Sequence, residues 1–211
     1  EDIMDWLHTY GEKLKPYVTD VGKILYEANK SGKSIIFEAQ LGALRDIDFG
    51  IYPYTSSSST ISAYAPIGAG IPGMKLDKSI GIMKAYSTCV GAGPFTVRMS
   101  GDEAEELRKA GNEYGAATGR PREVGAFDVV ASKYGVMLQG TDEVALTKLD
   151  VLSYLDKIPV CVAYDIDGEI TTDFPCGKRL DIAKPVIKYL DGWKIYGILV
   201  TVKTKDMFLQ K

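Results

Sequence analysis

Apolar runs of strand length alternate with helical stripes along most of this chain, and this alternation restricts its fold more than any other feature. Leu14, Val18, Val21 and Leu25 recur at helical spacing, which predicts an amphipathic helix over 12–29. Further runs have the composition of apolar strands, and they are 34–38, 80–86, 144–147 and 195–202. Strands that alternate with helices predict an α/β fold with a mostly parallel sheet flanked by helices.

Other stretches have the pattern of helices. The motif Ser100-Gly-Asp-Glu103 fits a capping box and predicts a helix to about Ala110. A second helical stripe ends at Gly140, a residue type that favours helix C-termini. Its members are Phe127, Val130, Ala131, Tyr134 and Leu138. Shorter helical stretches are expected at 149–155 and 179–190.

Two regions depart from this alternation. The segments 160–164 and 169–172 flank the turn sequence Asp165-Ile-Asp-Gly168, which predicts a β-hairpin. From 42 to 73 the chain is rich in Gly, Ser, Pro and Tyr, and this composition favours irregular loop of the kind found at active sites. Because no repeat and no composition shift marks a boundary, we expect 1–211 to form a single domain.

Composition excludes several classes of partner. With 211 residues, of which 45% are hydrophobic and 25% charged, the chain has ordinary globular composition. Folding would bury about 70% of the surface of the unfolded chain. The formal net charge of −3 argues against a nucleic-acid partner. No apolar run approaches the roughly 18 residues of a membrane span, so no membrane partner is expected.

The thiols and the histidine point to an intracellular protein without a histidine-based metal site. Cys89, Cys161 and Cys176 are odd in number and widely spaced, which favours free thiols in a reducing cytosol. The N-terminal residues lack the apolar region of a signal peptide, so we expect a cytoplasmic location. His8 is the only histidine, which excludes sites that need two, and its polar surroundings favour a surface role.

Two glycine motifs match nucleotide-binding patterns only by their letters. Ser31-Gly-Lys-Ser34 resembles the end of a Walker A loop, but Glu27 stands where that pattern needs its first glycine, and a strand follows the motif instead of preceding it. Gly68-Ala-Gly-Ile-Pro-Gly73 matches G-x-G-x-x-G, but no clear strand leads into it. We expect a turn at the first motif and a loop at the second.

The segment 111–122 is the strongest candidate for a binding loop. It reads Gly-Asn-Glu-Tyr-Gly-Ala-Ala-Thr-Gly-Arg-Pro-Arg, with three glycines, a threonine and two arginines. Bare backbone N–H groups suit anions, and guanidinium groups bind carboxylate or phosphate through paired hydrogen bonds. The residues therefore indicate an anion-binding loop, with a solvated arginine loop as the alternative.

The first of four blocks reads Phe37-Glu-Ala-Gln-Leu-Gly-Ala-Leu-Arg-Asp-Ile-Asp-Phe-Gly-Ile-Tyr-Pro-Tyr54 and continues into Ser56-Ser-Ser-Ser-Thr60. The others are 84–95, the binding loop extended through Gly125 and Asp128, and 147–151. Together these blocks resemble the adenylosuccinate synthetase family, whose members join IMP to L-aspartate with GTP, and they occur in that family's order. The family pattern for the first block begins close to F-E-G-A-Q-G-A-L-L-D-I-D-x-G-T-Y-P. The resemblance implies that family's fold, a P-loop-type α/β fold, over roughly its middle half.

The fourth block implies recognition of guanine. Thr147-Lys148-Leu149-Asp150 follows a predicted strand. An Asp150 carboxylate can accept hydrogen bonds from guanine N1–H and its exocyclic amine, while the Lys148 stem covers the base. Adenine lacks that pair of donors, so the site would select GTP over ATP. Taken alone, the tetrapeptide favours a surface Lys and Asp at a strand end, and the family context is what favours guanine recognition.

The resemblance also assigns the other two substrates. It implies that aspartate is bound by residues of the second and third blocks, namely Val90, Gly115, Thr118, Arg120 and Arg122. Arg120 would also reach IMP, and Arg122 would also reach GTP. Pro121 and Glu123 replace family arginines, which lowers the local positive charge, and Ala117 replaces a threonine.

Contacts to IMP fall in the first block. Ser56 matches a family threonine that contacts the IMP phosphate. The family glutamine beside the hypoxanthine is shifted, since its place falls on Leu41 while Gln40 stands one residue earlier. A shift of one residue on a strand reverses the side chain's face, so either position remains open. Cys89 stands where the family commonly has an arginine, and no reactive role is expected for it.

The family's catalytic aspartate and histidine belong to an N-terminal phosphate-loop part that this sequence does not match. We therefore expect neither a catalytic residue nor a metal ligand in this chain, with the Mg²⁺ ligands mostly in that other part. The C-terminal end of the family pattern is not matched either. The chain could be a fragment, a split subunit or a natural truncation. It is expected to act as a homodimer or with a complementing N-terminal segment, or else as a non-catalytic nucleotide-binding, aspartate-binding or dimerisation domain.

Overall fold

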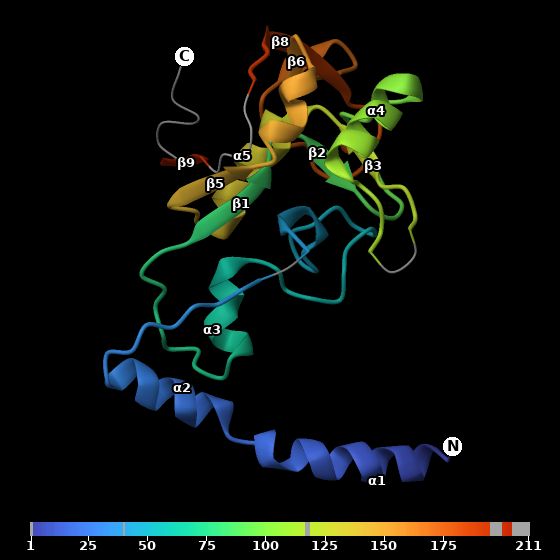
Figure 1. Ribbon diagram of the computed structural model, residues 1–211. Coiled ribbons are helices and arrows are strands. Elements are labelled where there is room, and N and C mark those ends of the chain that lie inside the picture. The colour runs from blue at the N-terminus through green and yellow to red at the C-terminus, as the bar shows by residue number, and fades with distance from the viewer. Residues whose placement is uncertain (1, 40, 117–118, 195–199, 204–211) are drawn as a thin grey trace. The chain divides into compact units, whose positions relative to one another are not determined.

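Figure 1 shows the computed structural model, which describes residues 2–39, 41–116, 119–194 and 200–203. The chain divides into two compact units. Unit 1 comprises Glu1–Glu38 and Tyr64–Lys75, and unit 2 comprises Ala39–Ala63 and Leu76–Lys211. No linker or composition shift in the sequence accompanies this division.

Unit 1 is helical. It contains α1 (Ile3–Leu14), the 3₁₀ turn η1 (Lys15–Tyr17), α2 (Val21–Lys30) and α3 (Ala65–Gly68). Side chains of aspartate cap the two longer helices: Asp2 accepts from the Met4 N–H at 3.1 Å, and Asp20 accepts from the Lys23 N–H at 3.0 Å. These caps fit the preference of aspartate for helix N-termini.

Two predictions for unit 1 are wrong. The single helix over 12–29 is interrupted at Pro16, which lies in η1 and lacks the backbone N–H that a continuing helix needs. The chain is extended at Val18 and enters a new helix after Asp20. The run 34–38 is loop and not a strand, since no described strand pairs with it and Ile36 is exposed. Gly32, with φ of 73°, forms the expected turn after α2.

Unit 2 contains three small sheets. In the first, β1 (Ile80–Lys84) lies parallel to β5 (Glu143–Thr147), which is antiparallel to β9 (Val200–Lys203). The second pairs β2 (Ser87–Cys89) with β3 (Glu123–Gly125) in antiparallel fashion.

The third sheet is built on β6 (Lys157–Ile166), which is parallel to β4 (Phe127–Asp128) and antiparallel to β7 (Glu169–Thr171) and β8 (Lys184–Asp191). The α/β class and the hairpin at Asp165–Gly168 are confirmed. The pairings among the described strands are more mixed than the expected, mostly parallel sheet.

The helices of unit 2 lie where the sequence placed them, with one exception. The two longer ones are α4 (Gly101–Gly111) and α5 (Val129–Gln139), and Gly140 ends the latter in the left-handed conformation. Short 3₁₀ turns are η2 (Ala43–Arg45), η4 (Asp150–Tyr154) and η5 (Gly177–Leu180), while η3 (Ser62–Tyr64) runs across the boundary from unit 2 into unit 1. Ser100 stands at the N-terminus of α4, but its side chain makes no capping hydrogen bond.

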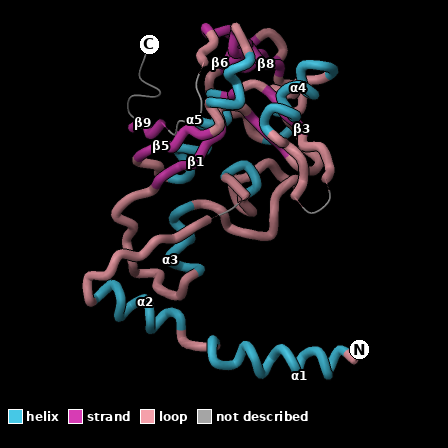
Figure 2. Tube along the Cα trace, viewed as in Figure 1, coloured by secondary structure: helices cyan, strands magenta, loops and turns pink. Residues whose placement is uncertain are grey.

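The helix predicted at 179–190 is wrong, because most of this segment forms β8 along β6. Pro185 lies within it and disfavours a helix interior. The loop character expected between 42 and 73 holds, since only short helical turns interrupt it (Figure 2). No helix among the described residues is long and apolar enough to cross a membrane.

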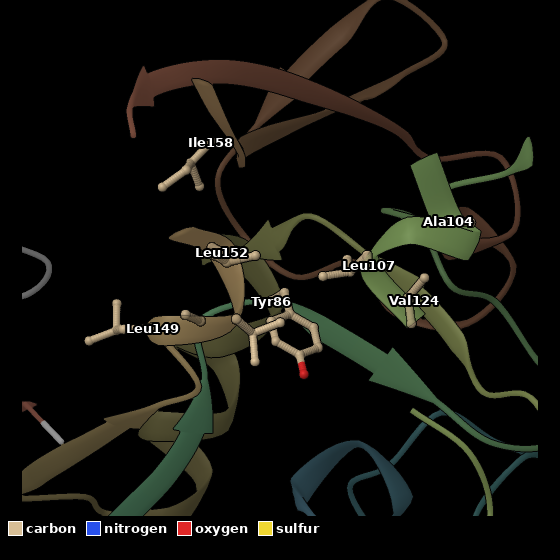
Figure 3. Close-up of a cluster of buried hydrophobic side chains, with 9 residues drawn as sticks. Tyr86, Ala104, Leu107, Val124, Leu149, Leu152 and Ile158 are labelled. Atoms are coloured by element: carbon tan, nitrogen blue, oxygen red, sulfur yellow. The ribbon is translucent and has the colours of Figure 1, made fainter. Parts of the chain in front are cut away.

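One apolar cluster fixes the elements around the candidate site (Figure 3). Its buried members are Ala85, Tyr86, Ala104, Leu107, Val124, Leu149, Val151, Leu152 and Ile158. They come from the end of β1, from α4, β3 and η4, and from the start of β6. The positions of these chain segments relative to one another are therefore set by burial of apolar surface, the main favourable term in folding.

A second cluster lies around α5 and β6, with Val130, Cys161 and Tyr164 at its centre. Asp128 is buried there and caps α5, accepting from the Ala131 N–H at 3.0 Å. The Tyr164 hydroxyl donates to the other Asp128 carboxylate oxygen at 2.6 Å. Asp128 and Tyr164 thus each have a hydrogen-bond partner, as buried polar groups require.

Candidate functional site

The candidate site lies at the carboxyl ends of β1 and β5. These strands are parallel, and Lys84 of β1 is in register with Thr147 of β5. Lys148 follows at once with a positive φ of 62°, and Asp150 begins η4. Both side chains are exposed. In α/β proteins, ligands bind outside the carboxyl ends of strands, so this edge is a favoured place for a substrate.

The arginine loop, defined as residues 111–122, folds back on itself beside this edge. The Arg122 N–H donates to the Glu113 carbonyl oxygen at 3.0 Å, and the Gly115 N–H donates to the Arg120 carbonyl oxygen at 2.8 Å. Tyr114 and Pro121 form an isolated antiparallel bridge. This narrow hairpin leaves Arg120 exposed and Arg122 half-buried at its base.

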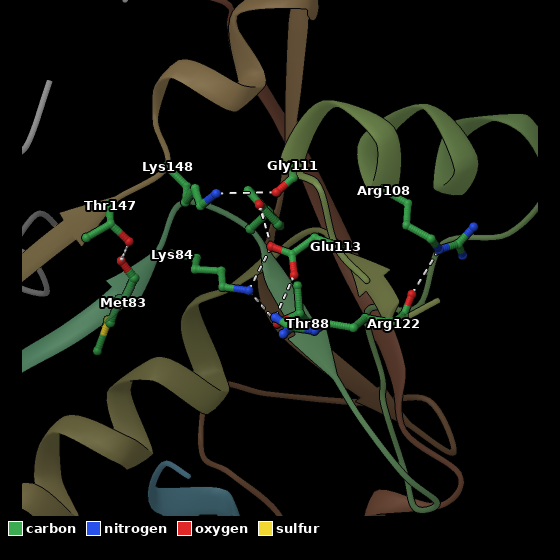
Figure 4. A network of polar contacts seen from close by, with 10 residues as sticks. Met83, Lys84, Thr88, Arg108, Gly111, Glu113, Arg122, Thr147 and Lys148 are labelled. Atoms are coloured by element: carbon green, nitrogen blue, oxygen red, sulfur yellow. Dashed lines mark hydrogen bonds and ion pairs between the residues drawn. The ribbon is translucent and has the colours of Figure 1, made fainter. Parts of the chain in front are cut away.

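Glu113 is the centre of a polar network at the base of the arginine loop (Figure 4). Its side chain is only 2% exposed. Its Oε1 atom accepts from Lys84 Nζ at 2.8 Å and from the Tyr86 hydroxyl at 2.7 Å. Its Oε2 atom accepts from Arg122 Nη1 at 3.0 Å. The network therefore joins the end of β1 to the arginine loop.

The charges explain why a buried carboxylate is tolerated here. Burial pushes the pKa of Glu113 upward, but the hydrogen bonds from Lys84 and Tyr86 oppose it. Together with the nearby positive charges they hold the pKa of Glu113 below its ordinary value of 4.5. The pKa of the Tyr86 phenol is raised, first by burial and then by its hydrogen bond to Glu113. Glu113 is thus ionised and Tyr86 neutral near pH 7.

Lys148 connects the β5 end to the same loop. Its Nζ atom donates to the Gly111 carbonyl oxygen at 3.3 Å (Figure 4). The negative charge of Asp150 also contributes to the raised pKa of Tyr86, after burial and the contact with Glu113. The residues predicted to read guanine and the arginine predicted to hold aspartate therefore lie around one short stretch, Gly111 to Glu113.

A second polar cluster is centred on Arg45, at the end of η2. Its Nη2 atom donates to the Val90 carbonyl oxygen at 2.9 Å and to Cys89 Sγ at 2.9 Å. Its Nη1 atom donates to the carbonyl oxygens of Tyr54 and Ala92, the latter at 3.3 Å. One guanidinium group thus ties the loop after β2 to the 42–60 segment.

Antiparallel pairing brings the two clusters to the same end of one strand ladder. Cys89 of β2 is in register with Glu123 of β3. Continuing that register places Val90 beside Arg122, which precedes β3. Val90 is 63% exposed, so its side chain is accessible from solvent. Val90 directly follows β2 and Arg122 directly precedes β3, so both predicted aspartate residues lie at the same end of this strand pair.

Ser56 is placed near this cluster but is engaged within the fold. Its hydroxyl donates to the Arg45 carbonyl oxygen at 2.9 Å and accepts from the Ser58 N–H at 3.2 Å. An IMP phosphate would have to compete with the Arg45 carbonyl for the Ser56 hydroxyl proton. The predicted residues Gln40 and Thr118 lie outside the described residues.

Several residues that build the site were not singled out by the sequence patterns. They are Arg45, Lys84, Tyr86 and Glu113. All four lie inside the family-like blocks, and Lys84 also has a usable signal, since it is a charged residue that ends an apolar strand. Their burial and their mutual contacts depend on tertiary packing, which no local pattern encodes.

The described side chains do not provide the cluster of ligands that a metal ion needs. Magnesium prefers several oxygen ligands around one point. Within the part of the chain that the structure describes, no three His, Cys, Asp or Glu side chains are grouped to hold a metal ion. These residues do not form a Mg²⁺ site of their own, and no chemical step is assigned to Mg²⁺ here. The three cysteines are free thiols, as expected.

Comparison with known proteins gives a consistent result. Residues 1–207 match the family model described as adenylosuccinate synthetase. The adenylosuccinate synthetase of Caldanaerobacter subterraneus subsp. tengcongensis is 44% identical over 194 residues, and that of Prochlorococcus marinus (strain MIT 9301) is 45% identical over 195 residues. Each match covers 92% of this chain and 45% of the relative.

A solved structure is also similar. The fully ligated adenylosuccinate synthetase from Plasmodium falciparum aligns with a TM-score of 0.85 at 35% sequence identity. The alignment covers 90% of this chain and 46% of that chain. The chain therefore spans a little under half the length of the relatives that it matches.

Proposed function

The chain belongs to the adenylosuccinate synthetase family, and from this premise we propose that it serves as part of a GTP-dependent carbon–nitrogen ligase. The reaction joins IMP to L-aspartate and yields adenylosuccinate, GDP and phosphate, a step of AMP and purine biosynthesis. The observation that carries this proposal is the link between Lys148 and the arginine loop at Gly111. Through it, the guanine-reading strand end and the aspartate-binding loop form one continuous site.

Each candidate residue has a defined task in this proposal. The exposed Asp150 carboxylate accepts hydrogen bonds from guanine N1–H and the exocyclic amine, and the Lys148 stem covers the base. Arg120 and Arg122 hold the carboxylates of aspartate through charge-assisted hydrogen bonds, with each arginine also reaching one nucleotide. Val90 and the backbone of Gly115 line the aspartate pocket.

The remaining assignments concern IMP and the hydroxyl groups. Ser56 donates to the IMP phosphate after turning from the Arg45 carbonyl oxygen. Gln40 and Thr118 keep their proposed contacts to IMP and aspartate on the sequence resemblance alone. No described residue is assigned as the catalytic base, so these side chains act by binding, orientation and charge stabilisation.

The proposal extends to cofactor, assembly and location. Mg²⁺ accompanies GTP in phosphoryl transfer and neutralises charge on its phosphates. We propose that its protein ligands lie mostly in the part of the family that this chain does not match. A homodimer, or a complex with a complementing N-terminal segment, is proposed as the working assembly. A cytoplasmic location is proposed, supported by the three free thiols.

Nucleotide selectivity tests the assignment of Asp150. Calorimetric titration of the 211-residue chain should show tighter binding of GDP than of ADP. Asp150→Asn should weaken GDP binding by about tenfold or more, because a charge-assisted hydrogen bond contributes roughly 1.5–3 kcal/mol. Asp156→Asn removes an exposed carboxylate of the same type and should change neither affinity. Equal affinity for GDP and ADP in the unaltered chain would refute guanine recognition.

Turnover separates the ligase from a binding domain. A coupled assay with IMP, GTP, Mg²⁺ and aspartate should give negligible turnover for the chain alone. It should give clear turnover once the N-terminal part of the Caldanaerobacter relative is added as a second polypeptide. Binding of GDP and aspartate without turnover in either case would favour a non-catalytic nucleotide- and aspartate-binding domain.

A further inference from the structure

We propose that Glu113 is a positioning residue, which fixes the guanidinium group of Arg122 for an anionic substrate. The proposal rests on the proposed function, in which Arg122 binds the carboxylate of L-aspartate. Glu113 itself touches no substrate in this scheme. It acts on the substrate only through the arginine that it orients.

Glu113 holds Arg122 at two points. The Glu113 carbonyl oxygen accepts from the Arg122 backbone N–H at 3.0 Å. The Glu113 carboxylate accepts from Arg122 Nη1, also at 3.0 Å. Backbone and side chain are thus both held by the same residue, which restricts where the guanidinium plane can lie. Such restriction lowers the ordering cost of binding.

The two carboxylate oxygens of Glu113 bind different partners. Oε1 is occupied by Lys84 and Tyr86, which anchor Glu113 to the end of β1. Oε2 is left for Arg122. Because Glu113 is only 2% exposed, its carboxylate cannot swing out toward water without breaking these contacts. The anchor on β1 therefore sets the position of Arg122 relative to Lys148 at the end of β5.

The net charge of this network is positive, which favours binding of an anion. Lys84 and Arg122 carry two positive charges and Glu113 carries one negative charge. The surplus of one positive charge favours an anionic group beside Arg122. The Nε atom of Arg122 is buried and has no hydrogen-bond partner within the described ranges. An unpaired buried donor is costly, and a substrate oxygen that accepted from it would relieve that cost.

A positioning role and a charge-reducing role of Glu113 predict opposite effects of Glu113→Gln on the binding of L-aspartate. Removing the negative charge of Glu113 makes the surroundings of Arg122 more positive. If Glu113 only reduced the positive charge, Glu113→Gln would tighten the binding of any anion. If Glu113 orients Arg122, the same change weakens the binding of L-aspartate although the site has become more positive.

Binding of aspartate is therefore measured with three variants of the 211-residue chain. Glu113→Gln should raise the Kd for L-aspartate by about tenfold or more and reduce the preference for L- over D-aspartate. Glu113→Asp keeps the charge and should restore part of both. Glu169→Gln removes a carboxylate that pairs with Arg179 on the surface, and it should change nothing. Unchanged or tighter L-aspartate binding in Glu113→Gln would overturn the proposal.

A ligand-free measurement separates this proposal from the proposed function. In ¹⁵N NMR spectra, the Arg122 Nε–H should exchange slowly with water, because the atom is buried. In Glu113→Gln the exchange should become at least about tenfold faster, while circular dichroism stays native. Suppose that the Arg122 Nε–H exchanges slowly in the unaltered chain and faster in Glu113→Gln, but that the chain does not bind aspartate. That result would support the positioning role of Glu113 and refute L-aspartate as the substrate. An Nε–H that stays equally slow in Glu113→Gln would refute positioning.

Discussion

Lys148 and Gly111, 37 residues apart in the chain, are joined by a hydrogen bond from Lys148 Nζ to the Gly111 carbonyl oxygen. Gly111 also packs closely against Tyr86, since a Cβ atom on it would lie 2.4 Å from the Tyr86 hydroxyl oxygen. Gly111 thus contacts both the candidate guanine-binding residue Lys148 and the Tyr86 hydroxyl, which donates to Glu113. The close packing explains why a residue without a side chain stands there.

Gly111→Ala should disturb this arrangement. The added methyl group would force the Tyr86 hydroxyl away from Glu113, so we expect a loss of about 1–3 kcal/mol in the free energy of unfolding. Urea denaturation measures it. Gly11→Ala in helix α1 is the matched control, because nothing lies within 4 Å of its Cβ position. That change should be neutral or stabilise by up to about 1 kcal/mol. Equal effects of the two variants would contradict the packing described for Gly111.

Arg45→Met should release the loop after β2. The guanidinium group binds the carbonyl oxygens of Val90 and Ala92 as well as Cys89 Sγ, and methionine replaces none of these bonds. We expect faster reaction of Cys89 with a thiol reagent, measured by mass spectrometry of the labelled peptides. The exposed Cys176 should react quickly and the buried Cys161 slowly in both proteins.

The control for this variant is Arg98→Met. Arg98 pairs with Glu123 at 3.2 Å on the surface, and among the described residues its guanidinium group forms no ion pair with the loop after β2. Its loss should leave the labelling rate of Cys89 unchanged. If Arg45→Met also left that rate unchanged, the guanidinium group would not be what holds the loop.

Sequence patterns predicted the elements whose signals are local. The stripe ending at Gly140 and the hairpin around Asp165–Gly168 formed as expected, because a C-terminal glycine and a turn sequence act over a few residues. The helix predicted at 179–190 did not form, since the conformation of this segment is set by pairing with β6. Tertiary pairing of this kind overrides local propensity.

The candidate site shows the same division between local and long-range information. The arginine loop and the strand end at Lys148 were visible as motifs, because family-like blocks preserve their own sequence. Their connection was not visible, since it runs through Glu113, Lys84 and Tyr86, which meet only after β1 and the loop have packed on one core. A buried carboxylate has no sequence pattern that separates it from a solvated one.

Tyr164→Phe should be more costly at neutral than at acidic pH. Burial raises the pKa of Asp128 above its ordinary value of 3.8, although the Tyr164 hydroxyl lowers it in part. A raised pKa means that the contribution of Asp128 to stability is full below about 3.8 and declines as pH rises through the folded value. Losing the hydroxyl raises that pKa further, so the penalty should grow with pH and reach about 1–3 kcal/mol at pH 7.

Urea unfolding at pH 3.5 and pH 7 measures that difference, with Tyr189→Phe as control. Tyr189 is 67% exposed on β8, so its hydroxyl is solvated and its loss should matter little at either pH. A penalty for Tyr164→Phe that is the same at both values would mean that Asp128 does not titrate differently in the folded and unfolded chains.

Glu113→Gln should also cost more stability at neutral than at acidic pH, although the pKa of Glu113 is lowered whereas that of Asp128 is raised. Burial raises the pKa of Glu113, but Lys84 and the other partners lower it more, and the folded value lies below 4.5. A lowered pKa stabilises the fold above the unfolded value, and this stability is lost as pH falls from about 4.5 through the folded pKa. Removing one partner of a buried ion pair costs about 3–5 kcal/mol, so we expect a loss of that size at pH 7.

The loss should shrink as pH falls below about 4.5, because the unaltered protein then protonates Glu113 itself. Fluorescence of Trp193 can follow unfolding of unit 2 in a Trp6→Phe background, since the Trp193 indole donates to the Leu149 carbonyl oxygen at 2.8 Å and packs on the core. Glu169→Gln, at an exposed ion pair, should stay within about 0.5 kcal/mol of the parent at every pH. A Glu113→Gln penalty that stayed constant down to pH 3 would show that the ionised Glu113 carboxylate contributes nothing to stability through its charge.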